Sequence, residues 1–189
     1  MPSKKIDLPV HRIRAYLEPG PIVLVSSADK DQRNVMTMGW HTVMEFSPSL
    51  FGCVIAGGNH SFDIICSTRE CVINLPTSDM VDTVVGIGNT SGRDTDKFEK
   101  FGLTAEKSTR LKKAPLITEC YANFECRLHD DALVDKYNFF IWEVVKAHVS
   151  KTPKNPETLH YTGDGVFVAS GKTISRRGAF KPSMLGNGR

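Results

Sequence analysis

The sequence predicts a mainly β fold, a β-barrel with inserted helices. Short runs rich in β-branched and other apolar residues recur along the 189-residue chain, separated by Gly, Pro, Asn and Asp. Helix-type periodicity is confined to the middle of the chain. No GxGxxG sequence opens a helix after a strand-like run, which argues against a doubly wound dinucleotide-binding sheet. Six or more short strands with two or three helices fit a barrel better.

Three strands are expected in the first part of the chain, over residues 21–29, 35–46 and 50–56. Each is followed by turn-forming residues: DKDQRN after the first, Ser-Pro-Ser after the second and two glycines after the third. This punctuation predicts short antiparallel strands rather than a long continuous one.

Helices are expected in the middle of the chain. From residue 61 the apolar residues fit one face of a two-turn helix, and a proline-terminated strand over 71–76 follows it. Residues 78–88 begin with a serine and early acids, place apolar residues on one face and end in glycines. Residues 96–103 form a short third helix with two inward phenylalanines and a glycine stop.

Strands resume in the last part of the chain. Residues 115–131 and 137–150 are long enough to form the two arms of a meander, and residues 165–175 form a last strand. The sequence contains no internal repeat, no low-complexity segment and no clear linker.

Composition excludes several classes of function. A net charge of +3 and 24% charged residues are ordinary for a globular protein, so nucleic acid is not an expected partner. The longest apolar stretches are far too short to span a bilayer, so a membrane is not an expected partner either. The N-terminal sequence lacks an apolar signal region, and the chain is expected to be cytoplasmic. Five scattered cysteines are expected to be buried thiols. The six histidines show no ligand spacing, so no metal is expected.

Two segments supply side chains that suit a phosphorylated, planar, redox-type ligand. NVMTMGWH offers an amide at Asn34, a hydroxyl at Thr37 and an indole at Trp40. SGRDTDKF offers two cations, Arg93 and Lys97. Hydroxyls and cations suit a phosphate, and an aromatic side chain suits a flat ring.

A third segment, AGGNHS, lies where a strand gives way to a helix. The free amides at a helix start form an anion site together with the helix dipole, and the two glycines let a ligand approach the backbone. Its candidate residues are Asn59, His60 and Ser61.

Each candidate also has an ordinary structural explanation when it is taken alone. Trp40 could pack in the core, Ser61 could cap its helix, and Lys97 could be a solvated partner of the acids around it. The sequence has no recognisable nucleophile elbow and no carboxylate pair. An enzyme of this kind would rely on a cofactor for its chemistry.

The order of the segments is more informative than any one of them. N-x-x-T-x-x-W, the glycine turn that opens a helix, CVINLP, SGRDTDKFEKFGL, PLITECYANFECRL and FIWEVV follow one another. This order resembles the flavin reductase-like, FMN-binding split-barrel family, and the flavoredoxin branch is most similar. The resemblance covers about residues 19–175 of a single domain that spans 1–189.

The resemblance implies a homodimeric, six-stranded split barrel with FMN at the subunit interface. It implies flavin contacts from the side chains of Asn34, Thr37 and Trp40, and from the backbone amides of Met36, Met38 and Gly39. It implies a phosphate position at Ser61 with Asn59 and His60 beside it, phosphate or ribityl contacts from Lys97 and Arg93, and an aromatic position at Phe167.

Tyr137 marks a departure from the family pattern. It stands where relatives often carry histidine after an aspartate. With an ordinary pKa near ~10, a tyrosine donates a hydrogen bond rather than shuttling a proton at neutral pH.

The resemblance also implies an FMN-dependent oxidoreductase. Electrons would pass from NAD(P)H or a redox protein through FMN to flavin, ferric or protein acceptors. Two alternatives stay open: a non-catalytic FMN-binding electron carrier or sensor, or an oxidase similar to pyridoxamine-phosphate oxidase. The oxidase needs further basic residues for a second phosphate, for which the sequence offers Arg176 and Arg177.

Overall fold

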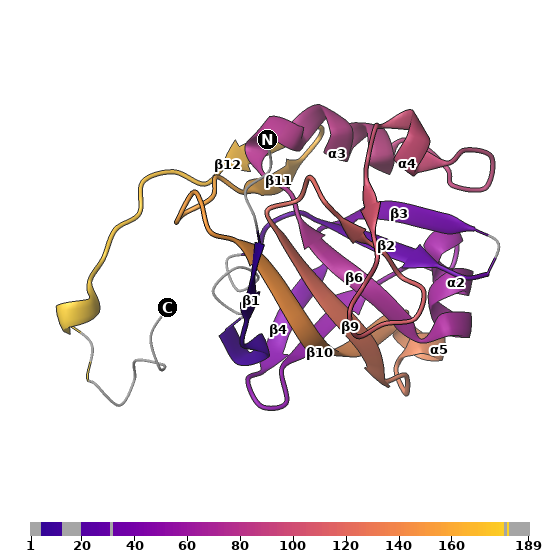
Figure 1. Cartoon of the computed structure of the whole chain (residues 1–189), viewed down its shortest axis with the longest axis horizontal. Helices are drawn as coiled ribbons and strands as arrows, with labels where there is room; N and C mark the ends of the chain where they lie inside the picture. Colours follow the sequence, from indigo (N-terminus) through magenta and orange to yellow (C-terminus); the bar gives the residue numbers. More distant parts are fainter. Residues whose placement is uncertain (1–4, 13–19, 31, 180, 182–189) are drawn as a thin grey trace.

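The computed structural model describes residues 5–12, 20–30, 32–179 and 181, and it shows a curled antiparallel sheet (Figure 1). The strands of this sheet are β1 (Lys5–Leu8), β2 (Val23–Ala28), β3 (Arg33–Met38), β4 (His41–Glu45), β5 (Leu50–Val54), β6 (Glu70–Leu75), β9 (Ala122–Asp130) and β10 (Phe139–Ser150). Two small strand pairs lie outside it: β7 (Ala105–Glu106) with β8 (Leu116–Ile117), and β11 (Leu159–Gly163) with β12 (Val166–Ala169). The helices are α2 (His60–Thr68), α3 (Val81–Gly88), α4 (Lys97–Lys100) and α5 (Val134–Tyr137), with single 3-10 turns η1 (Val10–Arg12), η2 (Ser78–Met80) and η3 (Arg177–Ala179).

The sheet has the strand order β3-β2-β6-β9-β10-β5-β4, and β1 is attached to β10. The long strand β10 holds the sheet together, since it pairs with β9 along one side and with β5 and then β1 along the other. The two end strands, β3 and β4, are consecutive in the chain. The sheet therefore curls almost into a barrel, which confirms the mainly β fold expected from the sequence.

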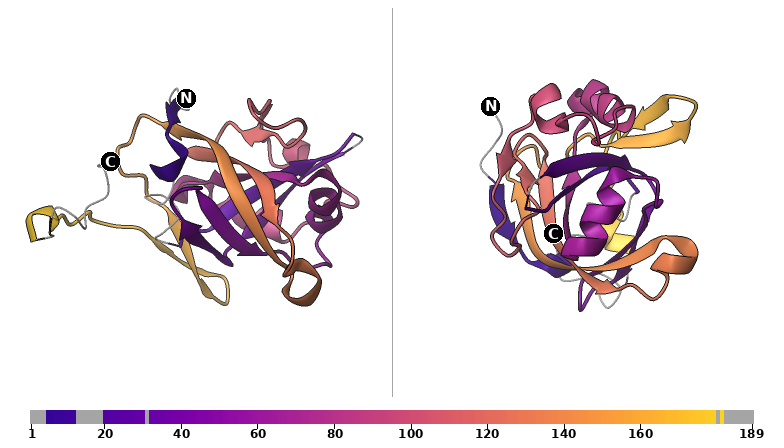
Figure 2. Two further views of the ribbon diagram at one scale, coloured as in Figure 1. Left: turned by 90° about the horizontal axis from the view of Figure 1, so that it is seen from below. Right: turned by 90° about the vertical axis from the view of Figure 1, so that its right-hand side faces the viewer.

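The inside of the curl is the main hydrophobic core. Phe51, Phe124, Phe140 and Trp142 are fully buried there, among aliphatic side chains from most strands. Helix α2 closes one open end, as the right-hand view of Figure 2 shows, and its Ile65 joins this core. The start of α2 is thereby fixed relative to the strands around it.

A second apolar layer lies on the outside of β2 and β3. Helices α3 and α4 cover these strands (Figure 1), with Ile87 and Phe98 packed against Leu24 and Val35. The β11–β12 hairpin joins this layer through Leu159, whose carbonyl accepts a hydrogen bond from Ile22 N. This layer determines where the α3–α4 connection meets β3.

Two buried glutamates anchor the segment 105–121 on the outside of β6 and β9. Glu125 accepts hydrogen bonds from the backbone amides of Thr109 (2.9 Å), Arg110 (2.6 Å) and Leu111 (3.1 Å), and also from the hydroxyl of Thr109 (2.8 Å). Glu125 Oε1 also lies 2.7 Å from Nε2 of His148. Glu70 accepts hydrogen bonds in the same way from the amides of residues 112–114. The two carboxylates provide hydrogen-bond acceptors for the backbone amides of a loop that has little regular structure of its own.

Several expected strands differ in extent from the observed ones. The sheet has eight strands among the described residues, which agrees with the six or more predicted from the pattern but exceeds the six that the resemblance implies, partly because β1 is added and the run 35–46 divides at residues 39–40. That run must divide, since β3 pairs with β2 while β4 pairs with β5 at the other edge of the sheet. The expected strand 115–131 is interrupted by a turn between β8 and β9, and the expected strand 165–175 is strand only over Val166–Ala169.

One cysteine contradicts its expected burial. Cys53, Cys71, Cys120 and Cys126 are buried, and burial raises the pKa of the Cys53 thiol to about 12. Cys66, in contrast, is exposed, since it lies on the outer side of α2. Four of the five cysteines are thus the small core residues that the sequence predicts.

Candidate functional site

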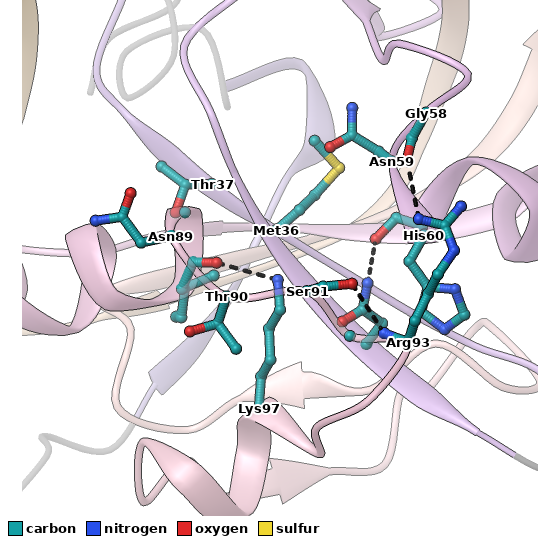
Figure 3. A pocket seen from close by; sticks show the side chains of 15 residues that line it. Met36, Thr37, Gly58, Asn59, His60, Asn89, Thr90, Ser91, Arg93 and Lys97 are labelled. Atoms are coloured by element: carbon teal, nitrogen blue, oxygen red, sulfur yellow. Dashed lines mark hydrogen bonds between the residues drawn. The ribbon is translucent and has the colours of Figure 1, made fainter.

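A pocket of about 300 Å³ opens where β3, the start of α2 and the α3–α4 connection meet (Figure 3). These three walls are the three segments that the sequence analysis singled out. The predicted residues that line the pocket are Asn34, Met36, Thr37, Asn59, His60, Ser61, Arg93 and Lys97. The fold thus brings together residues that are up to 63 positions apart, Asn34 and Lys97.

Lys97 is buried in one wall of the pocket, with 5% of its surface exposed. Its Nζ donates hydrogen bonds to the carbonyl oxygens of Val35 (2.9 Å) and Ile87 (3.0 Å), and it has no ion pair among the described residues. This geometry rules out a solvated lysine paired with neighbouring acids. Burial lowers the pKa of Lys97. An ammonium group has three donors, so a third remains for a ligand in the pocket.

The position of Lys97 is fixed by its neighbour Asp96. The Asp96 carboxylate caps α4 by accepting hydrogen bonds from the amides of Phe98 (2.8 Å) and Glu99 (3.3 Å). It also accepts hydrogen bonds from Nε and Nη2 of Arg33 on β3, at 3.1 and 2.9 Å. Helix α4 is therefore attached to β3 both through Asp96 and through Lys97.

Asn34 lines the pocket and carries an unsatisfied polar atom. Its Nδ2 donates a hydrogen bond to Oγ of Ser61 (2.9 Å), and both residues are buried. Its Oδ1 is buried and has no hydrogen-bond partner among the described residues. An unpaired buried acceptor is costly, so this atom fits a ligand that brings a hydroxyl or another donor.

The start of α2 provides further donors. The helix is nine residues long, and Asn59, its N-cap residue, makes no side-chain cap. The amide of Asn59 instead donates from Nδ2 to the carbonyl of Ala56 (3.1 Å). The first turn thus presents uncapped backbone amides beside Ser61, at the positive end of the helix dipole. An anion is the ligand that this arrangement favours.

The α3–α4 connection contacts the turn before α2. Arg93 Nη1 donates to the carbonyl of Gly58 (3.2 Å), and the Arg93 amide donates to Oγ of Ser91 (3.2 Å). His60 Nε2 lies 2.9 Å from Oε1 of Gln32 and faces the β2–β3 turn. Two basic side chains, Arg93 and Lys97, therefore face one pocket from the same wall.

Gly92 lets this connection approach Asn34 closely. A Cβ atom added at Gly92 would overlap the side-chain amide of Asn34. Because the Asn34 amide is already held by Ser61, the methyl group would have to displace the 91–93 segment or break that hydrogen bond.

We expect the substitution Gly92→Ala to weaken ligand binding in this pocket with little loss of overall stability, since the change is confined to a connection. A matched control is Gly171→Ala, because a Cβ atom there meets nothing within 4 Å and Gly171 does not line the pocket. Titration of both variants with flavins, beside thermal unfolding curves, checks this. Equal flavin affinity in wild type and Gly92→Ala would show that the close approach is unimportant.

Five predicted site residues lie outside the pocket. Met38 is buried in the main core, and Gly39 packs against Ile22. The others are the exposed Trp40, Tyr137 on α5, and Phe167 on β12, which packs on the second apolar layer. Trp40 is 76% exposed, so the core-packing explanation of this residue is wrong; the buried tryptophan is Trp142.

Some lining residues were missed in the sequence analysis. They are Ile87, Gly88, Asn89 and Thr90, the end of α3 and the turn after it. The available signal was the run of glycines, Asn and Thr after an amphipathic helix, which reads equally well as an ordinary helix stop. Arg176 and Arg177, the residues available for a second phosphate, lie in the exposed segment after β12 and do not line the pocket.

Among the described residues, no three His, Cys, Asp or Glu side chains are grouped as metal ligands. In the same part of the chain, no helix has the length and apolar character needed to cross a membrane.

Sequence comparison places this chain beside known proteins. The family model "Flavin reductase like domain" matches residues 15–169. A protein of Archaeoglobus fulgidus is 32% identical over 136 residues, which are 72% of each chain. The Escherichia coli protein YddH is 29% identical over 187 residues, covering 92% of this chain and 98% of its own. Both relatives are named only as uncharacterized proteins.

Solved structures share the fold. An FMN-binding domain of a flavin reductases-like enzyme from Shewanella baltica superposes with a TM-score of 0.85 at 23% identity, over 93% of this chain and 98% of that one. Flavoredoxin of Desulfovibrio vulgaris gives a TM-score of 0.76 at 20% identity, over 84% and 90% of the two chains. Flavoredoxin of Methanosarcina acetivorans gives 0.73 at 24% identity, over 87% and 92%.

Proposed function

Because this chain belongs to the flavin reductase-like domain family, we propose that it binds FMN in the pocket described above and works as an FMN-dependent oxidoreductase. One observation carries the proposal. Lys97, the uncapped start of α2 and the unsatisfied Asn34 Oδ1 converge on a single pocket. Relatives of known structure are named as FMN-binding proteins, which agrees with this ligand.

The donors in the pocket match a phosphate group. The backbone amides at the start of α2, the remaining donor of Lys97 and the guanidinium of Arg93 would hold the phosphate oxygens. Two cations near a phosphate monoester complement its charge of about −2 at neutral pH.

The acceptor in the pocket matches a sugar alcohol. Asn34 Oδ1 needs a donor, and the ribityl chain next to the phosphate of FMN carries hydroxyl groups. Thr37 is already engaged, since its Oγ1 donates to the carbonyl of Val84 (2.7 Å), so it supports the wall through α3. These residues would fix the phosphate and ribityl end of the cofactor, which orients the ring relative to β3 and Trp40.

When bound, FMN supplies the redox chemistry, taking a hydride from a reduced nicotinamide nucleotide or electrons from a redox protein and passing them on. His60 lines the pocket at the start of α2, where the phosphate is proposed to bind, and not at the ring end. Tyr137, exposed on α5, would act as a hydrogen-bond donor. The chain's own part is to bind, to orient and to provide backbone donors where negative charge gathers on the ring.

A homodimer is part of the proposal. The edge strand β4 and its flanks carry exposed apolar side chains, Trp40 (76% exposed), Met44 (43%) and Phe46 (51%). An exposed apolar surface of this kind is typical of an interface. A second copy covering it would remove Trp40 from water and enclose the ring end of the cofactor.

Anaerobic titration of the FMN-loaded protein with NADH and with NADPH tests the catalytic part. The proposal predicts bleaching of the flavin absorbance by at least one of the two nucleotides at catalytic rates. If FMN binds tightly but stays oxidised with both, the protein is an electron carrier or sensor, and the reductase function is wrong. The nucleotide that bleaches faster also identifies the preferred donor.

A further inference from the structure

The side chain of Arg93 crosses one end of the pocket. In Figure 3 it lies at the end formed by His60, while Thr37 and Asn89 lie at the other end. Its Nη1 donates to the carbonyl of Gly58 (3.2 Å), so it links the α3–α4 connection to the turn before α2. The hydrogen bond between His60 and Gln32 lies beyond the same end of the pocket.

We propose that Arg93 closes the phosphate end of the pocket and so makes the site selective for FMN over the dinucleotide FAD. This inference rests on the proposed function, since it concerns the same pocket. The phosphate of FMN is a terminal monoester, whereas in FAD the same phosphate continues into a second phosphate and an adenosine. A pocket that accepts FAD needs an exit past the start of α2.

The observed contacts obstruct that exit. In the proposed binding mode, the phosphate lies between the uncapped amides of α2 and Lys97 on the opposite wall. The bond from Arg93 to Gly58 links the two walls at the end of the pocket where His60 lies. Any group attached to the outer phosphate oxygen would have to displace this bond.

The segment that carries Arg93 is held in place. Gly92 lies against the Asn34 amide with no space for a side chain, and the Arg93 amide is bound to Ser91. The guanidinium is exposed, but its backbone is fixed, so its reach to Gly58 does not depend on a loose loop. The bond is therefore part of the resting shape of the pocket.

Charge adds to the selectivity. A phosphate monoester carries about two negative charges above its second pKa near 6, whereas each phosphate of a diester carries one. The pair Arg93 and Lys97 matches the monoester. In addition, Arg93 has donors beyond the one used for Gly58, and these can contact a terminal phosphate from the outside.

The two contributions predict opposite effects on FAD, and this makes the proposal testable. Removing Arg93 as a charge alone would weaken both flavins. If Arg93 also acts as a closure, removing it would weaken FMN through the lost charge but strengthen FAD through the opened exit. The test is titration of the wild-type chain, Arg93→Ala and Arg93→Met with FMN and separately with FAD, followed by flavin fluorescence. Arg110→Ala is the matched control, because Arg110 is an exposed arginine outside the pocket.

The expected result is that wild type binds FAD at least about tenfold more weakly than FMN. Both Arg93 variants should then bind FAD about threefold or more tightly than wild type does, and FMN more weakly, while Arg110→Ala changes neither. Weaker or unchanged FAD binding in both variants, or equal affinity of wild type for the two flavins, would overturn the inference. Absence of binding of either flavin to wild type would instead overturn the proposed function itself.

Discussion

Replacement of Lys97 by Met is expected to lower the affinity for FMN by roughly 10- to 100-fold, because a charge-assisted hydrogen bond to phosphate contributes about 1.5–3 kcal/mol. Methionine has a similar length and suits the buried position, so the volume of the wall is kept. The lysine Nζ is the only buried cation that the structure places at the pocket among the described residues.

The loss of a contact to the FMN phosphate has to be separated from a deformation of the pocket by the same substitution. Lys97 also binds the carbonyls of Val35 and Ile87, and their loss could deform the pocket. Riboflavin, which lacks the phosphate, provides the comparison. The expected result is a large loss for FMN, a small one for riboflavin, and no change for either ligand in Lys107→Met, an exposed lysine outside the pocket. Equal losses for both ligands would mean that Lys97 acts through the fold.

The pH dependence of binding gives a second readout. Since burial lowers the pKa of Lys97 while a bound phosphate favours its charged form, the affinity for FMN should fall as the pH rises toward this lowered pKa. In Lys97→Met this alkaline loss should be absent.

Replacement of Glu125 by Gln is expected to destabilise the fold by about 3–5 kcal/mol, since it removes a buried carboxylate that several hydrogen bonds stabilise and turns an acceptor into a donor among other donors. Glu125 is fully buried and accepts hydrogen bonds from three backbone amides and from Thr109 Oγ1, beside His148. The matched control is Glu143→Gln. Glu143 also faces a histidine, His129, at 4.0 Å, but that pair is exposed and should change stability by less than about 0.5 kcal/mol.

The same carboxylate predicts an acid-sensitive stability. Burial alone would raise the pKa of Glu125, but the hydrogen bonds from His148, Thr109 and Arg110 outweigh it and lower the pKa from 4.5 to about 2. A depressed folded-state pKa stabilises the protein above the unfolded value, and this stabilisation is lost as the pH falls from 4.5 to about 2. The loss amounts to about 3 kcal/mol.

Chemical denaturation at several pH values between 6 and about 2 measures this loss, and the slope should be flatter in Glu125→Gln than in wild type. An equal slope in both would show that other carboxylates cause the acid sensitivity.

The buried Glu125 also shows why part of the fold could not be predicted. Along β9, Phe124 and Cys126 lie in the core and Glu125 lies on the outer face. An outer face is usually solvated. Here the segment 105–121, which has no periodic pattern, folds over it and buries the carboxylate. A tertiary contact between two distant segments decided the outcome.

Only part of the candidate site could likewise be predicted from the sequence. The glycine turn before α2 and the cation in SGRDTDKF carry local signals, and both contribute to the pocket. That Lys97 is buried, and that it binds backbone carbonyls rather than acids, depends on how α4 packs on β3. The expected strand 35–46 is broken at Gly39 and Trp40 because β3 pairs with β2 at one edge of the sheet and β4 pairs with β5 at the other. No local sequence pattern reveals this pairing.

The central claim, that the pocket holds FMN, is tested most directly by the absorbance spectrum of the purified protein, with mass spectrometry of the ligand released on denaturation. The proposal predicts a flavin spectrum and the mass of FMN, or, for protein purified without ligand, stoichiometric uptake of added FMN. A colourless protein that takes up no FMN would contradict it, as would release of a haem or a different nucleotide.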